Sequence, residues 1–491
     1  MKVNLFTSLG PTRARAKTII LVVLSVLVIC PSLALAAGVH ALFDLSTPEK
    51  GPFPSDRFTV ADASHNTGLR VNLPKPDCQA RPSDCEDLDV INTLDGFNLQ
   101  PRLTVSFDGP IDVDTVRSDT VFLISLGSRL PGGDLGGRII GINQVVWDPE
   151  TNTLYVESDE FLDQHARYAL IVTSGVHGQD GAPVEATEAF RRFRQEVGGD
   201  YKHALLDAVH AAHRAGFRES DIVTASVFTT RSATAVVEKI RDQIKAQTPS
   251  PASFVSNGVR TVFPLSTISS ITLQQQTDVS PPGFTPDTVN LGFLEFVPRT
   301  VGTVAFGTFS SPNYQMPEKH IPPVGTLTGT PVIQGTNTLA FDLVLPSGAK
   351  PANGWPVAIF GHGGEGSKEL LFRVASTMAS KGFATIGINI PGHGFGPLST
   401  IIVTQTDGTR VTFPAGGRGE DQNGDNKINA NEGFDTVRPF LVIGNTDSLR
   451  QTVADLMQLV RVIRVGADVD GDGQADLDPL RIYYLDRKSV V

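Results

Sequence analysis

The fold is decided by residues 356–396, which run PVAIFGHGGEGSKELLFRVASTMASKGFATIGINIPGHGFG. An apolar run at 357–360 predicts a short strand that is buried on both faces. Apolar side chains then recur at helical spacing over 370–379, and Gly382 stands where the end of a helix needs a left-handed backbone. A second apolar run, 383–390, predicts another strand. The order strand, helix, strand predicts a crossover unit of a parallel sheet.

Each predicted strand ends in a glycine-rich turn, His362-Gly363-Gly364 after the first and Gly392-His393-Gly394 after the second. With these two turns the segment resembles the α/β-hydrolase family. The resemblance implies that His362, Gly363 and Gly364 border an oxyanion hole, where small residues let backbone N–H groups approach the developing charge. Taken singly, each turn is equally well explained as a tight connection between a strand and a helix.

The same resemblance implies a serine nucleophile in a Gly-x-Ser-x-Gly turn after the next helix and strand. Ser489 follows that strand but has Arg487 and Val491 where the motif has glycine. We therefore expect a truncated hydrolase that lacks its catalytic triad and is inactive as written. The expected function is that of an exported, calcium-stabilised serine-type hydrolase of esters or lipids.

The whole chain is acidic, with 41 Lys and Arg against 52 Asp and Glu in 491 residues and a net charge of −11. This balance excludes a basic surface for nucleic acid. The expected fold is multidomain, an all-β Ig-like sandwich followed by an incomplete α/β-hydrolase with a mostly parallel sheet and flanking helices. The predicted parts are a signal peptide (1–36), a turn-rich segment (37–100), the Ig-like sandwich (101–195), a helical connector (196–250) and the hydrolase portion (251–491).

The N-terminus has the pattern of a signal peptide. Basic residues precede an apolar run at 19–29, and Ala34-Leu35-Ala36 offers small residues for cleavage near Ala36. Lipid attachment at Cys30 and an uncleaved anchor remain as alternatives. No later stretch is long and apolar enough for a membrane span. The sequence thus predicts a secreted, periplasmic or cell-surface protein, with the cell envelope as a candidate partner.

Two cysteines remain after the predicted cleavage, Cys78 and Cys85, in a segment rich in Pro and Asp. In an oxidising compartment their spacing favours one disulfide over two free thiols.

Short apolar runs between residues 101 and 195 predict the strands of a β-sandwich, with residues 148–152 as a hairpin turn. This region resembles the bacterial Ig-like module of surface-layer and secreted proteins. Helices are predicted near 201–215 and 232–247, with a strand at 222–229 between them. Three histidines of the first helix, at 203, 210 and 213, are interpreted as part of a solvated face.

Residues 421–432 have the ligand spacing of an EF-hand calcium loop, with a hydrophobic residue at position 8 and a glutamate at position 12. Position 6 is Asn426 instead of Gly, a substitution that a left-handed backbone tolerates. An acidic loop without calcium is the alternative. The predicted calcium ligands are Asp421, Asn423, Asp425, Lys427, Asn429 and Glu432.

A second acidic loop, residues 468–478, carries the core D-x-D-x-D-G of a calcium loop and resembles those of dockerin and thrombospondin-type repeats. Position 12 is Pro479, so Asp478 or a distant acid would have to replace the usual closing glutamate. An acidic surface turn is the alternative. The predicted ligands are Asp468, Asp470, Asp472, Gln474 and Asp476.

Two classes of function follow from these motifs. The first is the hydrolase described above, with a small ester or lipid as substrate. The second is a non-catalytic calcium-binding protein of the cell surface that serves adhesion or glycan binding.

Overall fold

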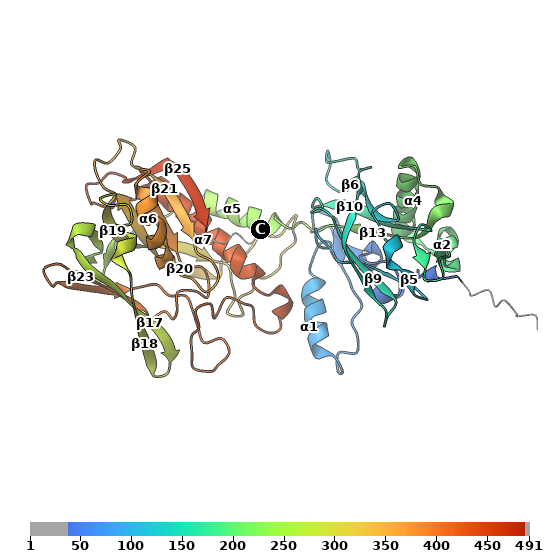
Figure 1. The fold of residues 1–491 in the computed structure, drawn as a ribbon, viewed down its shortest axis with the longest axis horizontal. Coiled ribbons are helices and arrows are strands. Elements are labelled where there is room, and N and C mark those ends of the chain that lie inside the picture. The colour runs from blue at the N-terminus through green and yellow to red at the C-terminus, as the bar shows by residue number, and fades with distance from the viewer. Residues whose placement is uncertain (1–37, 487–491) are drawn as a thin grey trace, which may run out of the picture. The chain divides into compact units, whose positions relative to one another are not determined.

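The computed structural model describes residues 38–486 (Figure 1). The predicted signal peptide, Cys30 and Ser489 lie outside the described residues.

The N-terminal half of the described chain is built on an antiparallel sheet in the order β13-β10-β6-β7. Its strands are β6 (Val121–Ser128), β7 (Ile139–Ile140), β10 (Ala166–Thr173) and β13 (Ile222–Thr229). Strand β10 is apolar at almost every position and is buried on both faces. A strand of this kind needs a cover on each side, because its side chains alternate between the two faces.

One of these covers is a second sheet, in the order β4-β9-β8. Its strands are β4 (Leu103–Ser106), β8 (Ile142–Asp148) and β9 (Thr153–Ser158). Leu103, Leu154 and Val156 pack with Leu170 of β10 in one core. The turn at 148–152 joins β8 and β9 in an antiparallel pair, so the predicted hairpin is confirmed.

The other cover is helix α4 (Gly199–Arg214), so the prediction of an all-β sandwich is wrong. Leu205, Ala208 and Ala212 of α4 pack against Phe122 of β6 and Ile171 of β10. The apolar face of this helix buries the side of β10 that the second sheet leaves free. Residues predicted as a helical connector therefore supply a strand and a covering helix of this half.

Short elements complete the half. Paired strands are β1 (His40–Ala41) with β12 (Glu185–Ala186), β2 (Thr59–Ala61) with β3 (Leu69–Val71), and β5 (Ile111–Asp112) with β11 (His177–Gly178); helices are α1 (Pro82–Ile91), α2 (Glu188–Arg191) and α3 (Phe193–Glu196).

The C-terminal half contains a six-stranded sheet in the order β16-β19-β20-β22-β21-β25. Its strands are β16 (Val262–Pro264), β19 (Val301–Asn313), β20 (Gly335–Pro346), β21 (Trp355–Gly361), β22 (Ala384–Ile388) and β25 (Leu477–Asp486). Strand β21 is parallel to both of its neighbours, whereas the pairs β16–β19, β19–β20 and β20–β22 are antiparallel. The prediction of a mostly parallel sheet is wrong, because the long pair β19–β20 makes this sheet mixed.

Helices cover both faces of the six-stranded sheet (Figure 1). The short helices η7 (Lys368–Leu371) and α6 (Phe372–Ala379) lie on one face, and α7 (Thr446–Val465) lies on the other. The predicted crossover of residues 356–396 is confirmed, since β21 and β22 pair in parallel around η7 and α6. Gly382 has φ of 75°, as expected for the end of that helix.

A four-stranded antiparallel sheet, in the order β18-β17-β23-β24, packs against the same core as α6. Its strands are β17 (Ile268–Val279), β18 (Pro282–Thr288), β23 (Thr400–Gln405) and β24 (Arg410–Pro414). Helix α5 (Ala235–Ala246) packs beside α7 through Ile240, Ile244 and Ala454. The short hairpin of β14 (Val255–Ser256) and β15 (Val259–Arg260) precedes β16.

Candidate metal centres

The first acidic loop, residues 421–432, is folded as the calcium pattern predicts. Carboxylate oxygens of Asp421, Asp425 and Glu432 all lie within 4.8 Å of one another. Backbone N–H groups hold these side chains inward: Gly424 and Asn426 donate to the two oxygens of Asp421 at 2.8 and 2.9 Å. Such a convergence of hard oxygens is suited to Ca²⁺.

Glu432, at the closing position, is held by the loop on both carboxylate oxygens. Its Oε1 accepts from the backbone N–H of Gln422 at 3.0 Å, and its Oε2 accepts from that of Asn429 at 3.1 Å. Asn426 has φ of 70°, so the left-handed backbone predicted for position 6 is confirmed. The departure from glycine therefore does not prevent the loop from closing.

The hydrophobic residue of this loop anchors it to the four-stranded sheet. Ile428 is buried, and its N–H donates to the carbonyl of Thr277 in β17 at 2.9 Å. Lys427 directs its side chain away from the carboxylates, to an ion pair with Asp278. Its backbone carbonyl thus remains available as the ligand of position 7. A bound cation at this loop would reinforce the end of β17.

In the second loop, residues 468–478, carboxylate oxygens of Asp468, Asp470 and Asp476 also lie within 4.8 Å of one another. Gly471 and Gly473 donate their N–H groups to the two oxygens of Asp468 at 2.6 and 3.0 Å. Asp476 is buried and accepts from the N–H of Val469 at 2.6 Å. The two loops share one scheme, in which the first aspartate is held by backbone groups three and five residues later.

A lysine that the sequence analysis missed lies at the second loop. The ammonium of Lys350 is 2.9 Å from Asp476, 3.4 Å from Asp472 and 3.6 Å from Asp470. Its hydrogen bond to Asp476 is the main cause that raises the pKa of Lys350. Asp478, the proposed substitute for the missing glutamate, is bound instead by Arg481 at 2.6 Å. The Lys350 ammonium therefore lies against carboxylates that a metal ion at the second loop would need.

The side chain of His362 is buried and has hydrogen-bond partners in two segments of the chain. Its Nδ1 is 3.0 Å from the carbonyl of Gly363, and its Nε2 accepts from the N–H of Ile390 at 3.3 Å. These partners define the neutral form with the proton on Nδ1. Burial is the main cause that lowers the pKa of His362 to about 4. The imidazole thus ties the turn after β21 to the end of β22.

Gly364, in the turn after His362, has open space beside its Cα. A Cβ added at Gly364 would meet nothing within 4 Å, so no close approach requires glycine there. His393, in the second turn, is buried, and its Nδ1 is 2.8 Å from the carbonyl of Pro391. Its Nε2 has no hydrogen-bond partner among the described residues.

A polar face of helix α7 is a further feature that the sequence analysis missed. Gln451 accepts from the N–H of Tyr314 at 2.8 Å and donates to Asp455 at 2.9 Å. Ser448 and Gln451 have the sequence spacing of a capping box, but they are buried and make no such cap, since the helix begins at Thr446. Their polar atoms instead hold the segment that follows β19.

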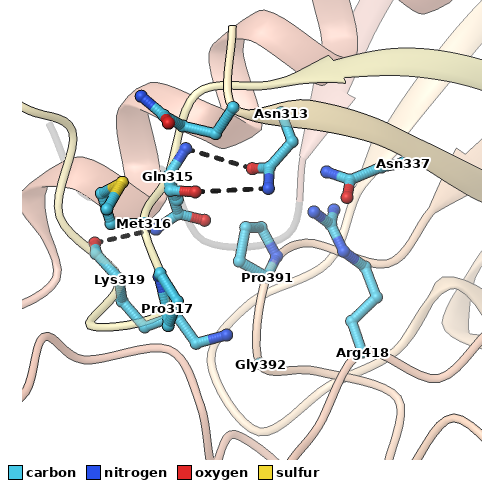
Figure 2. Close-up of a pocket in the computed structure, with 10 residues that line it drawn as sticks. Asn313, Gln315, Met316, Pro317, Lys319, Asn337, Pro391, Gly392 and Arg418 are labelled. Carbon is cyan, nitrogen blue, oxygen red and sulfur yellow. Dashed lines mark hydrogen bonds between the residues drawn. The ribbon is translucent and has the colours of Figure 1, made fainter.

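That segment borders a groove with a volume of about 580 Å³ (Figure 2). Arg418 lies at one side near Asn337, and its guanidinium donates to the buried Asp455 at 2.9 Å. Lys319, on the other side, pairs with Glu420 at 2.8 Å. Carboxamides and cations of this kind offer hydrogen bonds to a polar ligand. The lining residues are Asn313, Gln315, Met316, Pro317, Lys319, Gln334, Asn337, Pro391, Gly392 and Arg418.

Two other sequence predictions have clear outcomes. Cys78 and Cys85 form a disulfide, as expected. His203, His210 and His213 are exposed on α4, which agrees with the interpretation of a solvated face. No helix among residues 38–486 has the length and apolar character needed to cross a membrane.

Among solved structures, the chain is similar to parts of the bacterial S-layer protein SbsC. The N-terminal part of SbsC aligns at 11% identity with a TM-score of 0.17, covering 53% of this chain and 48% of the other. A second SbsC structure aligns at 10% identity with a TM-score of 0.16, covering 68% and 56%. The aligned part thus spans about half of the length of these neighbours. TM-scores of this size do not establish a shared fold.

No family model matches the chain, and no curated protein matches it. The central sheet is mixed instead of mostly parallel, and the comparisons give no evidence for an α/β-hydrolase, so the assignment to that family is wrong. The oxyanion role predicted for His362, Gly363 and Gly364 rested on that resemblance alone.

Proposed function

We propose that this chain is a non-catalytic calcium-binding protein of the cell surface or extracellular space. One observation carries the proposal, namely the convergence of Asp421, Asp425 and Glu432 within 4.8 Å in a loop with EF-hand spacing. The disulfide between Cys78 and Cys85 supports a location outside the cytosol, because such bonds persist in oxidising compartments.

The role of calcium in this proposal is structural. The first loop is anchored to β17 through Ile428, and the second loop directly precedes β25, the last strand of the six-stranded sheet. Ions at these places would hold the first loop to the end of an inner strand, β17, and the second loop to the edge strand β25. Extracellular modules bind Ca²⁺ with dissociation constants of about 10⁻⁴–10⁻³ M, which suits a protein that meets millimolar calcium.

The test is a calorimetric titration of the purified chain with Ca²⁺ in a buffer that has been freed of metal. We expect saturable binding that Glu432→Gln weakens by at least about tenfold, because a bidentate carboxylate closes the site. Glu295→Gln is the matched control, since Glu295 is exposed and lies outside both loops. Wild-type protein that binds no calcium, or equal weakening by both variants, would refute the proposal.

A further inference from the structure

A fully buried lysine lies between two carboxylates beside the six-stranded sheet. The side chain of Lys368, in η7, is 0% exposed, and its Nζ is 2.8 Å from Asp342 of β20 and 2.5 Å from Glu369. Asp342 is 1% exposed and Glu369 is 10% exposed. A lysine is almost never buried to this degree without a specific partner.

The surroundings of Asp342 differ from those of a stable buried ion pair. Apart from Lys368, no donor among the described residues reaches either of its carboxylate oxygens. Its neighbour on the same face of β20 is Val344, and Phe306 pairs with it across from β19. A buried ion pair needs additional hydrogen bonds to offset the cost of desolvation, and Asp342 lacks them.

The charges of the cluster also do not balance, since one ammonium faces two carboxylates. Burial raises the pKa of Asp342 to about 7, although Lys368 acts in the opposite direction. Burial lowers the pKa of Lys368, but the two carboxylates outweigh this effect and raise it. Of the two carboxylates Asp342 is therefore the one that takes up a proton more readily, while Lys368 rests as an ammonium. The neutral amine beside a neutral carboxylic acid is a minor state of the cluster.

These contacts place a nucleophile against an electrophile in a site without bulk water. We propose that Nζ of Lys368 condenses with Cγ of Asp342 to form an intramolecular amide bond, with Glu369 as the group that transfers the proton. Groups that are held in contact react as if at very high concentration, which replaces the external activation that amide formation otherwise needs.

The reaction balances within the cluster. The ammonium of Lys368 gives one proton to Asp342, and the amine lone pair then attacks Cγ to form a tetrahedral intermediate. Glu369 takes a second proton from the nitrogen and delivers it to the hydroxyl group on Cγ. The C–O bond breaks, one water molecule leaves, and Glu369 returns to its carboxylate form. No oxidant, reductant or further reactant is consumed.

A cavity next to the cluster can accept the water that is released. Asp342 and Lys368 both line a space of about 170 Å³, together with Phe341 and Phe413. One water molecule needs only about 30 Å³ of liquid volume. The side chains of Lys368 and Asp342 are themselves 0% and 1% exposed, which limits the access of bulk water to the amide and disfavours the reverse reaction.

The first measurement is peptide mapping of the full chain by mass spectrometry. Chymotrypsin cleaves after aromatic residues, and Phe360, which is followed by Gly361, lies between Asp342 and Lys368 in the sequence. We expect one linked pair of peptides whose mass is lower, by one water molecule, than the sum of the two. Trypsin should also fail to cleave after Lys368. Two separate peptides with an unmodified lysine would overturn the proposal.

The role of Glu369 is tested by Glu369→Gln, which should leave the chain unlinked while circular dichroism shows that it is folded. Glu365→Gln is the matched control, because Glu365 is exposed in the turn that precedes Lys368. This control should keep the linked pair in full yield. A linked Glu369→Gln chain would refute the assigned proton transfer. If the variant does not fold, the peptide map of the wild-type chain decides the proposal by itself.

Discussion

We expect Lys350 to limit calcium binding at the second acidic loop, because its ammonium lies among the carboxylates that a metal ion would use. It is 2.9 Å from the buried Asp476. Replacing it by methionine keeps most of the side-chain volume and removes the competing charge. We expect Lys350→Met to raise the calcium affinity of the second loop by roughly fivefold to tenfold, since two unit charges about 4 Å apart interact by about 1 kcal/mol in water.

Calcium titration of Lys350→Met in the Glu432→Gln background, where binding at the first loop is weakened, measures the affinity of the second loop. Lys381→Met provides the control, because Lys381 is exposed and remote in sequence from both loops. Equal affinities in the two lysine variants would show that Lys350 does not compete for the site.

His362 makes stability depend on pH because it is buried in its neutral form. Its folded pKa is about 4, whereas an unfolded histidine has a pKa of about 6.5. Between these values the unfolded chain binds more protons than the folded chain, so stability falls as the pH falls. The contribution of His362 is complete above pH of about 6.5 and is lost towards pH of about 4.

The variant His362→Gln keeps a donor and an acceptor but does not titrate. We expect the difference in unfolding free energy between wild type and variant to shrink by on the order of 2 kcal/mol as the pH falls from about 7 to about 4. Urea denaturation at a series of pH values measures this difference. A difference that is constant with pH would show that His362 has the same pKa in both states.

At the scale of elements, the periodicity of apolar residues predicted where the helices and strands lie. It did not predict which strands pair or in which direction. The apolar runs of residues 356–396 gave β21, α6 and β22 within a few residues. The direction of the other strands in that sheet depends on β19 and β20, whose pairing is set by contacts far along the chain. Local pattern carries no information on such partners, so the mixed sheet was predicted as mostly parallel.

At the candidate sites, too, the sequence predicted local features and missed contacts between residues that are distant in sequence. Within the first loop every ligand is local, and the spacing alone predicted the convergence of Asp421, Asp425 and Glu432. Lys350 is distant in sequence from the loop that it enters, so no local pattern indicates it. Ser448 and Gln451 have the spacing of a capping box, and only the neighbouring segment after β19 shows that they are buried bonding partners.

At the scale of the whole molecule, the hydrophobic clusters of the described residues fall into two sets. Two clusters consist of residues between 39 and 228, and the other three of residues between 236 and 485. Each set has its own buried sheets and covering helix. Two separate cores predict two unfolding transitions, because a cooperative unit is defined by a shared core.

Both acidic loops belong to the second set, so calcium should stabilise only one of these transitions. A ligand at about 100 times its dissociation constant adds about 2.7 kcal/mol to the unfolding free energy. For a unit of this size that corresponds to a rise of roughly 5–10 °C in the melting temperature. Removal of calcium by a chelator should reverse the rise and leave the other transition unchanged.

Differential scanning calorimetry with calcium and with a chelator measures this effect, and Glu432→Gln is the control. The variant should lose most of the calcium-dependent rise, because the first loop is the site without a competing lysine. A rise of equal size in both transitions would show that the two cores unfold as one unit. If neither unfolding transition of the wild-type chain shifts with calcium, calcium at the acidic loops does not contribute to the stability of the protein.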